Sequence, residues 1–126
     1  FGAREVFYLS GSSKIDRRSM VGAYHYIDVN HLNTYADFLA LKDKYTFVGL
    51  DCYPGAVSYV DFDWWALPKP PMIILGEEGD GLTNVTLDHV DHLVMIPMQG
   101  TIRSLNVAVA AGIIMADIHA RYQAMK

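Results

Sequence analysis

Short apolar runs alternate along this chain with segments in which apolar residues recur at helical spacing. A run of β-type residues bounded by turn residues predicts a strand, and apolar positions three and four residues apart predict one face of a helix. The runs predict strands at residues 6–9, 24–29, 45–51, 71–75 and 92–98. Because strand and helix alternate, we expect an α/β fold: a Rossmann-like parallel sheet with right-handed crossovers and helices on both faces.

The expected helices lie between and after these strands. An amphipathic helix follows Asn30, a suitable N-cap residue, and ends near Lys44. Thr83 begins a short capped helix, and Ser104 begins a long terminal helix that ends near residue 123. The apolar stripe of the first helix is Leu32, Tyr35, Ala36, Leu39 and Ala40, and that of the last is Val107, Ala110, Ala111, Ile114, Met115 and Ile118.

The length of the chain predicts one domain, residues 1–126. With 52% hydrophobic residues the chain can form a core, but it is small for an enzyme built on a sheet covered by helices. We therefore expect a homodimer that covers the apolar area of the terminal helix. No apolar run is long enough to span a membrane and no signal pattern opens the chain, which predicts a soluble cytoplasmic protein.

The charge of the chain limits how it can bind nucleic acid. A net charge of −4 and a pI near 5.6 argue against RNA binding by bulk electrostatics, which leaves a basic footprint. Lys14, Arg17 and Arg18 form the one basic cluster of the sequence. This cluster is either a solvated turn or a local contact with RNA phosphates.

Cysteine and histidine offer no metal chemistry in this sequence. A single cysteine, Cys52, excludes an internal disulfide, and the histidines have no ligand spacing, so we expect no metal site. Cys52 is expected to be a buried small hydrophobe in a reduced, cytosolic protein. Residues 52–71 are expected to form a loop, in which Trp64 and Trp65 pack on the domain or across a dimer rather than stack on a base.

Residues 75–112 depart most from an ordinary pattern. The strand at 71–75 ends at a glycine-rich acidic turn, residues 76–81, where the absence of Cβ atoms lets backbone approach a ligand. The strand at 92–98 is broken by a proline, and the last helix begins at Ser104. Two strand ends and a helix start would therefore meet at the carboxyl edge of a parallel sheet, where ligands bind. Each piece alone also fits an ordinary turn or an N-cap, and the glycine turn is neither a P-loop nor a dinucleotide fingerprint.

The order and spacing of these pieces resemble the SpoU/TrmH family of SPOUT RNA methyltransferases. Gly76-Glu77-Glu78-Gly79 through Leu82 is similar to the family's second motif, and Ile96-Pro97-Met98 is similar to the strand end that closes it. Residues 100–112, with Ser-Leu-Asn-Val, resemble its third motif. Residues 1–6 and 19–23 are similar to its connecting segments, so the resemblance runs along almost the whole chain.

This resemblance implies an enzyme that transfers a methyl group from S-adenosyl-L-methionine to a ribose 2′-hydroxyl of tRNA or rRNA, and a fold with a deep C-terminal trefoil knot. It also assigns roles to residues of this chain. The cofactor-binding residues would be Leu50, Leu75, Gly76, Ile96, Met98 and Leu105, the catalytic residues Glu78, Ser104 and Asn106, and the RNA contacts Lys14, Arg17, Arg18 and Arg103.

The chain departs from the family in one respect. The family's first motif, an Asn-x-Gly followed by an arginine usually assigned to deprotonating the hydroxyl, would precede Phe1 and is not in this sequence. A chain cut at its N-terminus is the favoured explanation, so we expect it to bind the cofactor and methylate RNA poorly. The alternative is a catalytically impaired RNA-binding or assembly factor that keeps the cofactor pocket. A third interpretation, suggested by the net negative charge, is an α/β module that binds a small molecule and no RNA.

Overall fold

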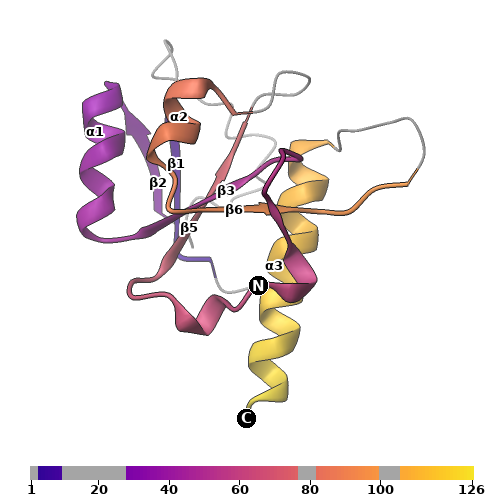
Figure 1. Ribbon diagram of the computed structural model, residues 1–126. Helices are drawn as coiled ribbons and strands as arrows, with labels where there is room; N and C mark the ends of the chain where they lie inside the picture. Colours follow the sequence, from indigo (N-terminus) through magenta and orange to yellow (C-terminus); the bar gives the residue numbers. More distant parts are fainter. Residues whose placement is uncertain (1–2, 10–27, 77–81, 100–105) are drawn as a thin grey trace. The chain divides into compact units, whose positions relative to one another are not determined.

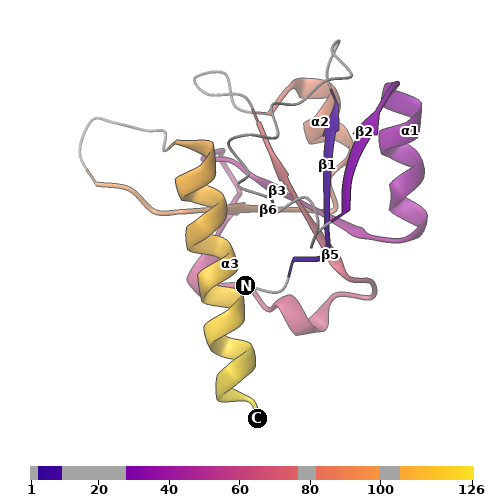
Figure 2. The same ribbon diagram turned by 180° about the vertical axis from the view of Figure 1, so that it is seen from behind.

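The computed structural model describes residues 3–9, 28–76, 82–99 and 106–126. The chain divides into two compact units, Phe1–Asp43 and Lys44–Lys126. Figures 1 and 2 show their helices and strands from opposite sides. Within the ranges given above, no helix is long and apolar enough to cross a membrane.

The first unit contains two parallel strands and a short helix. β1 (Glu5–Leu9) pairs with β2 (Asp28–Leu32) along its whole length. α1 (Tyr35–Ala40) follows β2 and continues as the 3-10 helix η3 (Leu41–Asp43). β1 confirms the strand predicted at residues 6–9.

Thr34 caps α1, so the prediction of Asn30 as the cap was wrong. Asn30 lies inside β2, and the helix can begin only after that strand ends. Thr34 Oγ1 accepts a hydrogen bond from Asp37 N (3.2 Å), and Asp37 Oδ2 accepts one from Thr34 N (3.1 Å), which makes a capping box. The later start also changes which face is buried: Phe38, outside the predicted stripe, is buried, whereas Ala36 is exposed.

The second unit is built on a parallel sheet with the strand order β4-β6-β3-β5. Its strands are β3 (Thr46–Leu50), β4 (Val57–Ser58), β5 (Pro71–Leu75) and β6 (His92–Met95). β3 and β5 confirm the strands predicted at residues 45–51 and 71–75. All the pairings are parallel, so the carboxyl ends of the strands lie at the same edge.

β6 ends at Met95, before the predicted end at Met98. Pro97 interrupts the predicted segment, and proline has no amide hydrogen to donate to a sheet. Ile96, Pro97 and Met98 therefore lie beyond the strand, at the edge where it ends.

Helix α2 (Asn84–His89) follows its predicted cap, because Thr83 Oγ1 accepts a hydrogen bond from Thr86 N (3.2 Å). Helix α3 (Val107–Ala124) confirms the long terminal helix, but the prediction that it begins at Ser104 was wrong. Asn106 is its N-cap and has a non-helical backbone (φ −53°, ψ 136°), so the helix starts after it.

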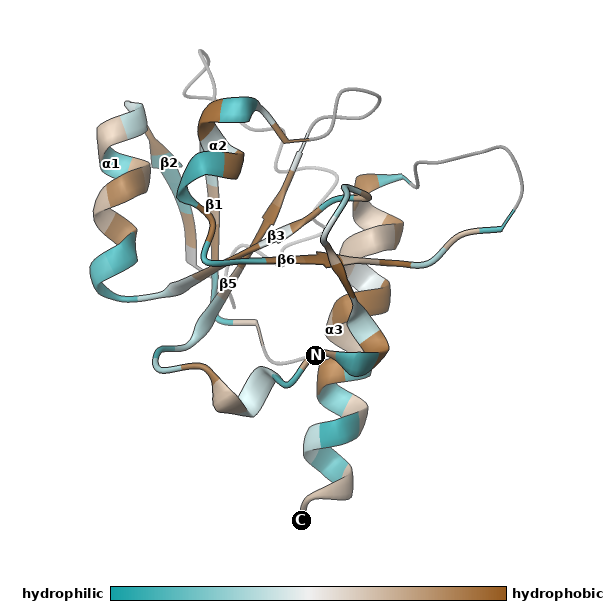
Figure 3. Ribbon diagram, viewed as in Figure 1, coloured by the Kyte–Doolittle hydropathy of each residue, from teal (hydrophilic) through white to brown (hydrophobic). Residues whose placement is uncertain are grey.

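One face of the four-stranded sheet is covered by α3. Val48 of β3 and Val94 of β6 pack there against Ile114 of α3, together with Phe62 and Trp64. In Figures 1 and 2, β3 and β6 run towards the side on which α3 lies. Figure 3 shows the hydrophobic colouring of these strands, and polar residues become more frequent towards the C-terminal turns of α3. The side chains packed between the sheet and α3 form the core of the second unit.

The opposite face of the sheet is covered by the residues that flank α2. A Cβ built on Gly49 would lie 2.8 Å from Leu82 Cδ1, 3.1 Å from Val90 Cγ1 and 3.2 Å from Leu93 Cδ1. Gly49 therefore lets these side chains approach the main chain of β3. Helices on both faces of a parallel sheet agree with the predicted α/β class.

Residues 52–71, predicted to be a loop, contain the edge strand β4 and the 3-10 helices η4 (Tyr59–Asp61) and η5 (Trp64–Ala66). Trp64 is only 5% exposed and belongs to the core, which confirms that it packs on the domain. Trp65 is 41% exposed. The prediction of a loop was wrong because short strands and 3-10 turns leave little periodicity in a sequence.

Candidate functional site

The carboxyl edge of the sheet brings together several of the predicted site residues. Leu50, the last residue of β3, pairs with Leu75, the last residue of β5, and also with Val94 of β6. Gly76 follows Leu75 directly, and Ile96 follows the last residue of β6. The predicted meeting of two strand ends is therefore confirmed, with the end of β3 between them.

Apolar surface remains partly open at this edge. Leu75 is 36% exposed, although it is the last residue of an apolar strand. Leu50 and Ile96 are half-buried and pack with one side against the core. Gly76 and Met98 are half-buried as well. Apolar side chains that the core holds in place, next to a residue without a Cβ, are suited to hold a ligand with apolar parts.

Asn106, a predicted catalytic residue, has a defined structural role. Its Oδ1 accepts hydrogen bonds from Ala108 N (2.9 Å) and Val109 N (3.3 Å), two amides of the first turn of α3 that have no partner within the helix. The cap uses the amide oxygen, whereas the side-chain NH2 group carries two donors of its own. Capping is therefore compatible with a second role for the same side chain.

The other predicted site residues lie outside the described part of the chain. They are the catalytic candidates Glu78 and Ser104, the cofactor candidate Leu105, and the basic residues Lys14, Arg17, Arg18 and Arg103.

Asp51 also lies at this edge, although the sequence patterns did not identify it as a site residue. Its carboxylate Oδ2 accepts a hydrogen bond from Leu82 N (3.2 Å), and its own amide donates to Val94 O (3.1 Å). Leu82 is buried, with 7% of its surface exposed, and lies on the far side of the glycine-rich turn from Gly76. Asp51 thus joins the end of β3 to two other segments of the edge.

Cys52 follows Asp51 and is exposed, so the prediction of a buried cysteine was wrong. The physical reason is that β3 ends at Leu50 and the chain turns at Pro54 and Gly55; the φ of Gly55 is +91°.

Within the described ranges, no group of His, Cys, Asp and Glu is arranged to hold a metal ion.

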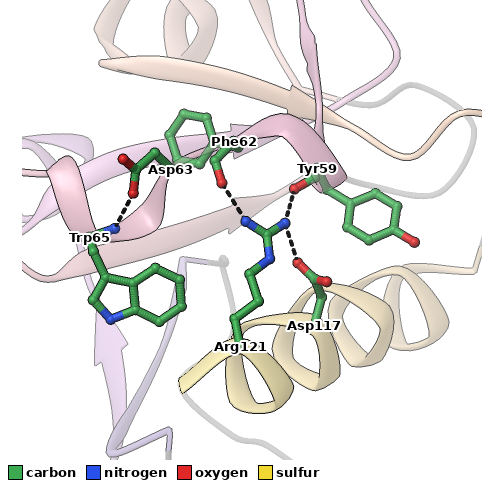
Figure 4. A network of polar contacts seen from close by, with 6 residues as sticks. All are labelled: Tyr59, Phe62, Asp63, Trp65, Asp117 and Arg121. Carbon is green, nitrogen blue, oxygen red and sulfur yellow. Dashed lines mark hydrogen bonds and ion pairs between the residues drawn. The ribbon is translucent and has the colours of Figure 1, made fainter. Parts of the chain in front are cut away.

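A polar network links the segment that follows the edge strand β4 to the terminal helix. Figure 4 shows Arg121 of α3 between Asp117 and the segment that follows β4. Its guanidinium donates to Phe62 O (2.7 Å) and to Tyr59 O (2.6 Å), and it pairs with Asp117 Oδ2 (2.6 Å). The network holds η4 against α3.

A family model decides the assignment of the chain. Residues 1–116 match the model described as the SpoU rRNA methylase family. The chain belongs to this family. The match covers the carboxyl edge described above, the whole first unit and residues 44–116 of the second, and it confirms the SpoU/TrmH resemblance of the sequence.

Relatives agree over shorter stretches. The chain is 45% identical over 51 residues to the 23S rRNA (guanosine-2′-O-)-methyltransferase RlmB of Neisseria meningitidis, a stretch of 40% of this chain and 20% of that protein. It is 58% identical over 41 residues to RlmB of Xanthomonas campestris, 32% of this chain and 16% of that protein. The aligned stretches therefore span no more than about a fifth of these relatives.

Solved structures share the fold along the chain. The A. aeolicus TrmH/SpoU tRNA modifying enzyme has a TM-score of 0.82 at 23% identity, over 98% of this chain and 64% of its own. An AdoMet-bound rRNA methyltransferase from Sinorhizobium meliloti has a TM-score of 0.75 at 26% identity, over 90% of this chain and 44% of its own. The α/β fold with parallel strands is the fold of these enzymes.

Proposed function

We propose that this chain is the methyl-transfer part of an RNA 2′-O-methyltransferase that uses S-adenosyl-L-methionine. The observation that supports this most is the carboxyl edge of the sheet. There the side chain of Leu75 is exposed and those of Leu50 and Ile96 are half-buried, beside Gly76. Membership of the SpoU rRNA methylase family and the AdoMet-bound S. meliloti neighbour support the same cofactor and reaction class. The substrate would be tRNA or rRNA, the classes named for the relatives.

The residues at the edge fit this cofactor. Adenine and the methionine chain need apolar contact, which the exposed side chain of Leu75 and the half-buried side chains of Leu50 and Ile96 would supply. Gly76 leaves its main-chain groups accessible because no Cβ shields them. Met98 and Leu105 remain proposed cofactor contacts from the family resemblance.

The reaction sets requirements that the chain's residues must meet. When bound, S-adenosyl-L-methionine would supply an electrophilic methyl group, and the residues of the chain would have to hold the ribose hydroxyl in line with it and provide an acceptor for the hydroxyl proton. The fixed strand ends would hold the methyl group in line with the oxygen, and orientation of this kind supplies a large part of the rate enhancement. Glu78, Ser104 and Asn106 are the proposed catalytic residues.

Asn106 offers a test that separates capping from chemistry. Asn106→Asp keeps a good N-cap oxygen but removes the NH2 donors, whereas Asn106→Ala removes both. If Asn106 acts in transfer, both variants lose activity and only the alanine variant loses stability, by about 0.5–2 kcal/mol. Full activity of the aspartate variant would show that Asn106 is only a cap.

The activity itself is tested with tritiated cofactor and RNA. We expect label in tRNA or rRNA at a site that alkaline hydrolysis does not cleave, because a 2′-O-methyl group blocks that cleavage. Label in a base would assign the chain to a different methylation chemistry. Cofactor binding without transfer by the natural protein would support the alternative, an RNA-binding or assembly factor that keeps the pocket.

A homodimer and a knot complete the proposal. The terminal helix carries exposed Val109 and Tyr122, and its C-cap residue Met125 is exposed as well, which is apolar area that a second copy of the chain would cover. Sedimentation of the natural protein as a dimer is expected, and a monomer at micromolar concentration would contradict it. The trefoil knot is proposed from the family resemblance.

A further inference from the structure

We propose that the ring of Tyr53 stacks on an unpaired base of the RNA substrate, beside the edge that holds the cofactor. This inference rests on the proposed function and deepens it, because it names a residue that contacts the RNA. Tyr53 lies in the connection between β3 and β4, residues 51–56.

This connection lies at the carboxyl edge of the sheet. β3 ends at Leu50 and β4 begins at Val57, and both of these residues are register partners of Val94 in β6. Since β6 lies between β3 and β4, the connection crosses it near its end, and Asp51 N donates a hydrogen bond to Val94 O (3.1 Å). Tyr53 is three residues from Leu50, so the Cα atoms of these two residues are no more than about 11 Å apart.

A tight turn fixes the main chain at Tyr53. Ala56 N donates a hydrogen bond to Tyr53 O at 3.0 Å, which closes a turn of four residues. Pro54 and Gly55 occupy its two central positions, and Gly55 has a φ of +91°. Proline followed by a glycine with positive φ is the arrangement of a type II turn. An aromatic residue on a fixed turn loses little conformational freedom when a ligand covers its ring.

The side chain of Tyr53 faces solvent. Tyr53 is 50% exposed, and all of residues 52–55 are exposed. Within the ranges that the structure describes, the side chain makes no hydrogen bond and no contact with another ring. The large exposed aromatic residues of the same ranges are Tyr53, Trp65 and Tyr122, and Tyr53 is the one in the connection at the carboxyl edge.

Stacking suits the charge of this chain. With a net charge of −4, the protein lacks the basic surface that holds RNA through its phosphates. An aromatic ring binds the face of a base without any positive charge. The base has to be unpaired, because the faces of a paired base are covered by its neighbours in the helix. A tyrosine beside the cofactor edge therefore favours a target in a loop or another single-stranded part of the RNA.

Trp65 provides a control, because it is an exposed aromatic residue of a different region. It lies in η5, between β4 and β5, and is 41% exposed. Its neighbour Trp64 packs on Phe62 (4.7 Å between ring centroids), and Phe62 packs on His92, the first residue of β6 (5.4 Å). Trp65 thus belongs to a segment that packs near the amino end of β6.

The experiment measures kcat and KM for methyl transfer by the natural protein, with tritiated cofactor and total RNA from cells that lack its gene. Tyr53→Leu keeps an apolar side chain without a ring and should lower kcat/KM for RNA about tenfold, mainly through KM. Tyr53→Phe and Tyr53→Trp keep a ring and should stay within about threefold of the wild type. Trp65→Leu should transfer as the wild type does. The dissociation constant of S-adenosylhomocysteine, measured by calorimetry, should be the same in all of these proteins.

Four results would overturn the proposal: wild-type kcat/KM in Tyr53→Leu, an equal loss in Tyr53→Phe, an equal loss in Trp65→Leu, or weaker binding of S-adenosylhomocysteine by Tyr53→Leu. If Tyr53→Leu does not fold, Tyr53→Met replaces it, and wild-type kcat/KM in that variant would be equally damaging. A folded wild-type protein that transfers no methyl group to any RNA would instead refute the proposed function, and the role of Tyr53 with it.

Discussion

Gly49→Ala tests the close packing over β3. An added Cβ would lie 2.8 Å from Leu82 Cδ1, about 0.7 Å inside the roughly 3.5 Å at which carbon–carbon contacts begin to be favourable. Val90 Cγ1 and Leu93 Cδ1 lie at 3.1 and 3.2 Å, so the new atom is confined from several directions. The side chain of Leu82 is buried, with 7% of the residue's surface exposed, so its Cδ1 can give way only by moving against its neighbours.

The expected cost of Gly49→Ala is the balance of two effects. Extra atoms in a packed site typically destabilise by about 1–3 kcal/mol. Replacing glycine restricts the unfolded chain and returns about 0.4–1 kcal/mol. We therefore expect a net loss of about 1–2 kcal/mol in the free energy of unfolding.

The control for this substitution is Gly112→Ala in the middle of α3. A Cβ on Gly112 meets no atom within 4 Å, and alanine favours a helix over glycine by about 1 kcal/mol. The same chemical change should therefore stabilise at Gly112 and destabilise at Gly49. Urea denaturation followed by the fluorescence of the buried Trp64 measures both. A Gly49→Ala chain as stable as the wild type would refute the packing argument.

Three further predictions follow from single contacts. Arg121→Met removes the hydrogen bonds to Tyr59 O and Phe62 O and should lower the free energy of unfolding, measured in urea, by about 1–3 kcal/mol. Arg121→Lys should recover only part of this lost stability. Full recovery by lysine would contradict the view that one guanidinium bonds to both carbonyl oxygens. Cys52 is exposed two residues after β3 ends, so cofactor at saturation should slow its alkylation, and an unchanged rate would place the ligand elsewhere. Thr83→Ala removes the cap of α2 and should cost about 0.5–2 kcal/mol, whereas Thr83→Ser should be nearly neutral in a thermal melt.

Much of the edge that forms the site could be predicted from the sequence. An apolar run that stops at glycine predicted the end of β5, and helical spacing predicted the apolar face of α3, including the buried Ile114. These signals are local, since a strand end or a helix face is determined by residues next to each other in the chain.

Other features depend on contacts between distant residues. The bond from Leu82 to Asp51 joins positions 31 residues apart, and no periodicity reports it. Cys52 was expected to be buried because cysteine usually is, but its exposure follows from where β3 happens to end. The start of α3 was misplaced because Ser104 and Asn106 are both good N-caps, and only the folded backbone shows that Asn106 is the one used.

The central claim is that the carboxyl edge of β3, β5 and β6 holds the cofactor, and amide NMR tests it most directly. The isotope-labelled chain of 126 residues would be titrated with S-adenosylhomocysteine while the signal of each backbone amide is followed. We predict that the amides of Leu50, Gly76 and Ile96 shift, whereas those of Thr46 and Asp91, at the opposite edge, do not. Shifts confined to Thr46 and Asp91, or no shifts in a folded chain at saturating ligand, would contradict the account.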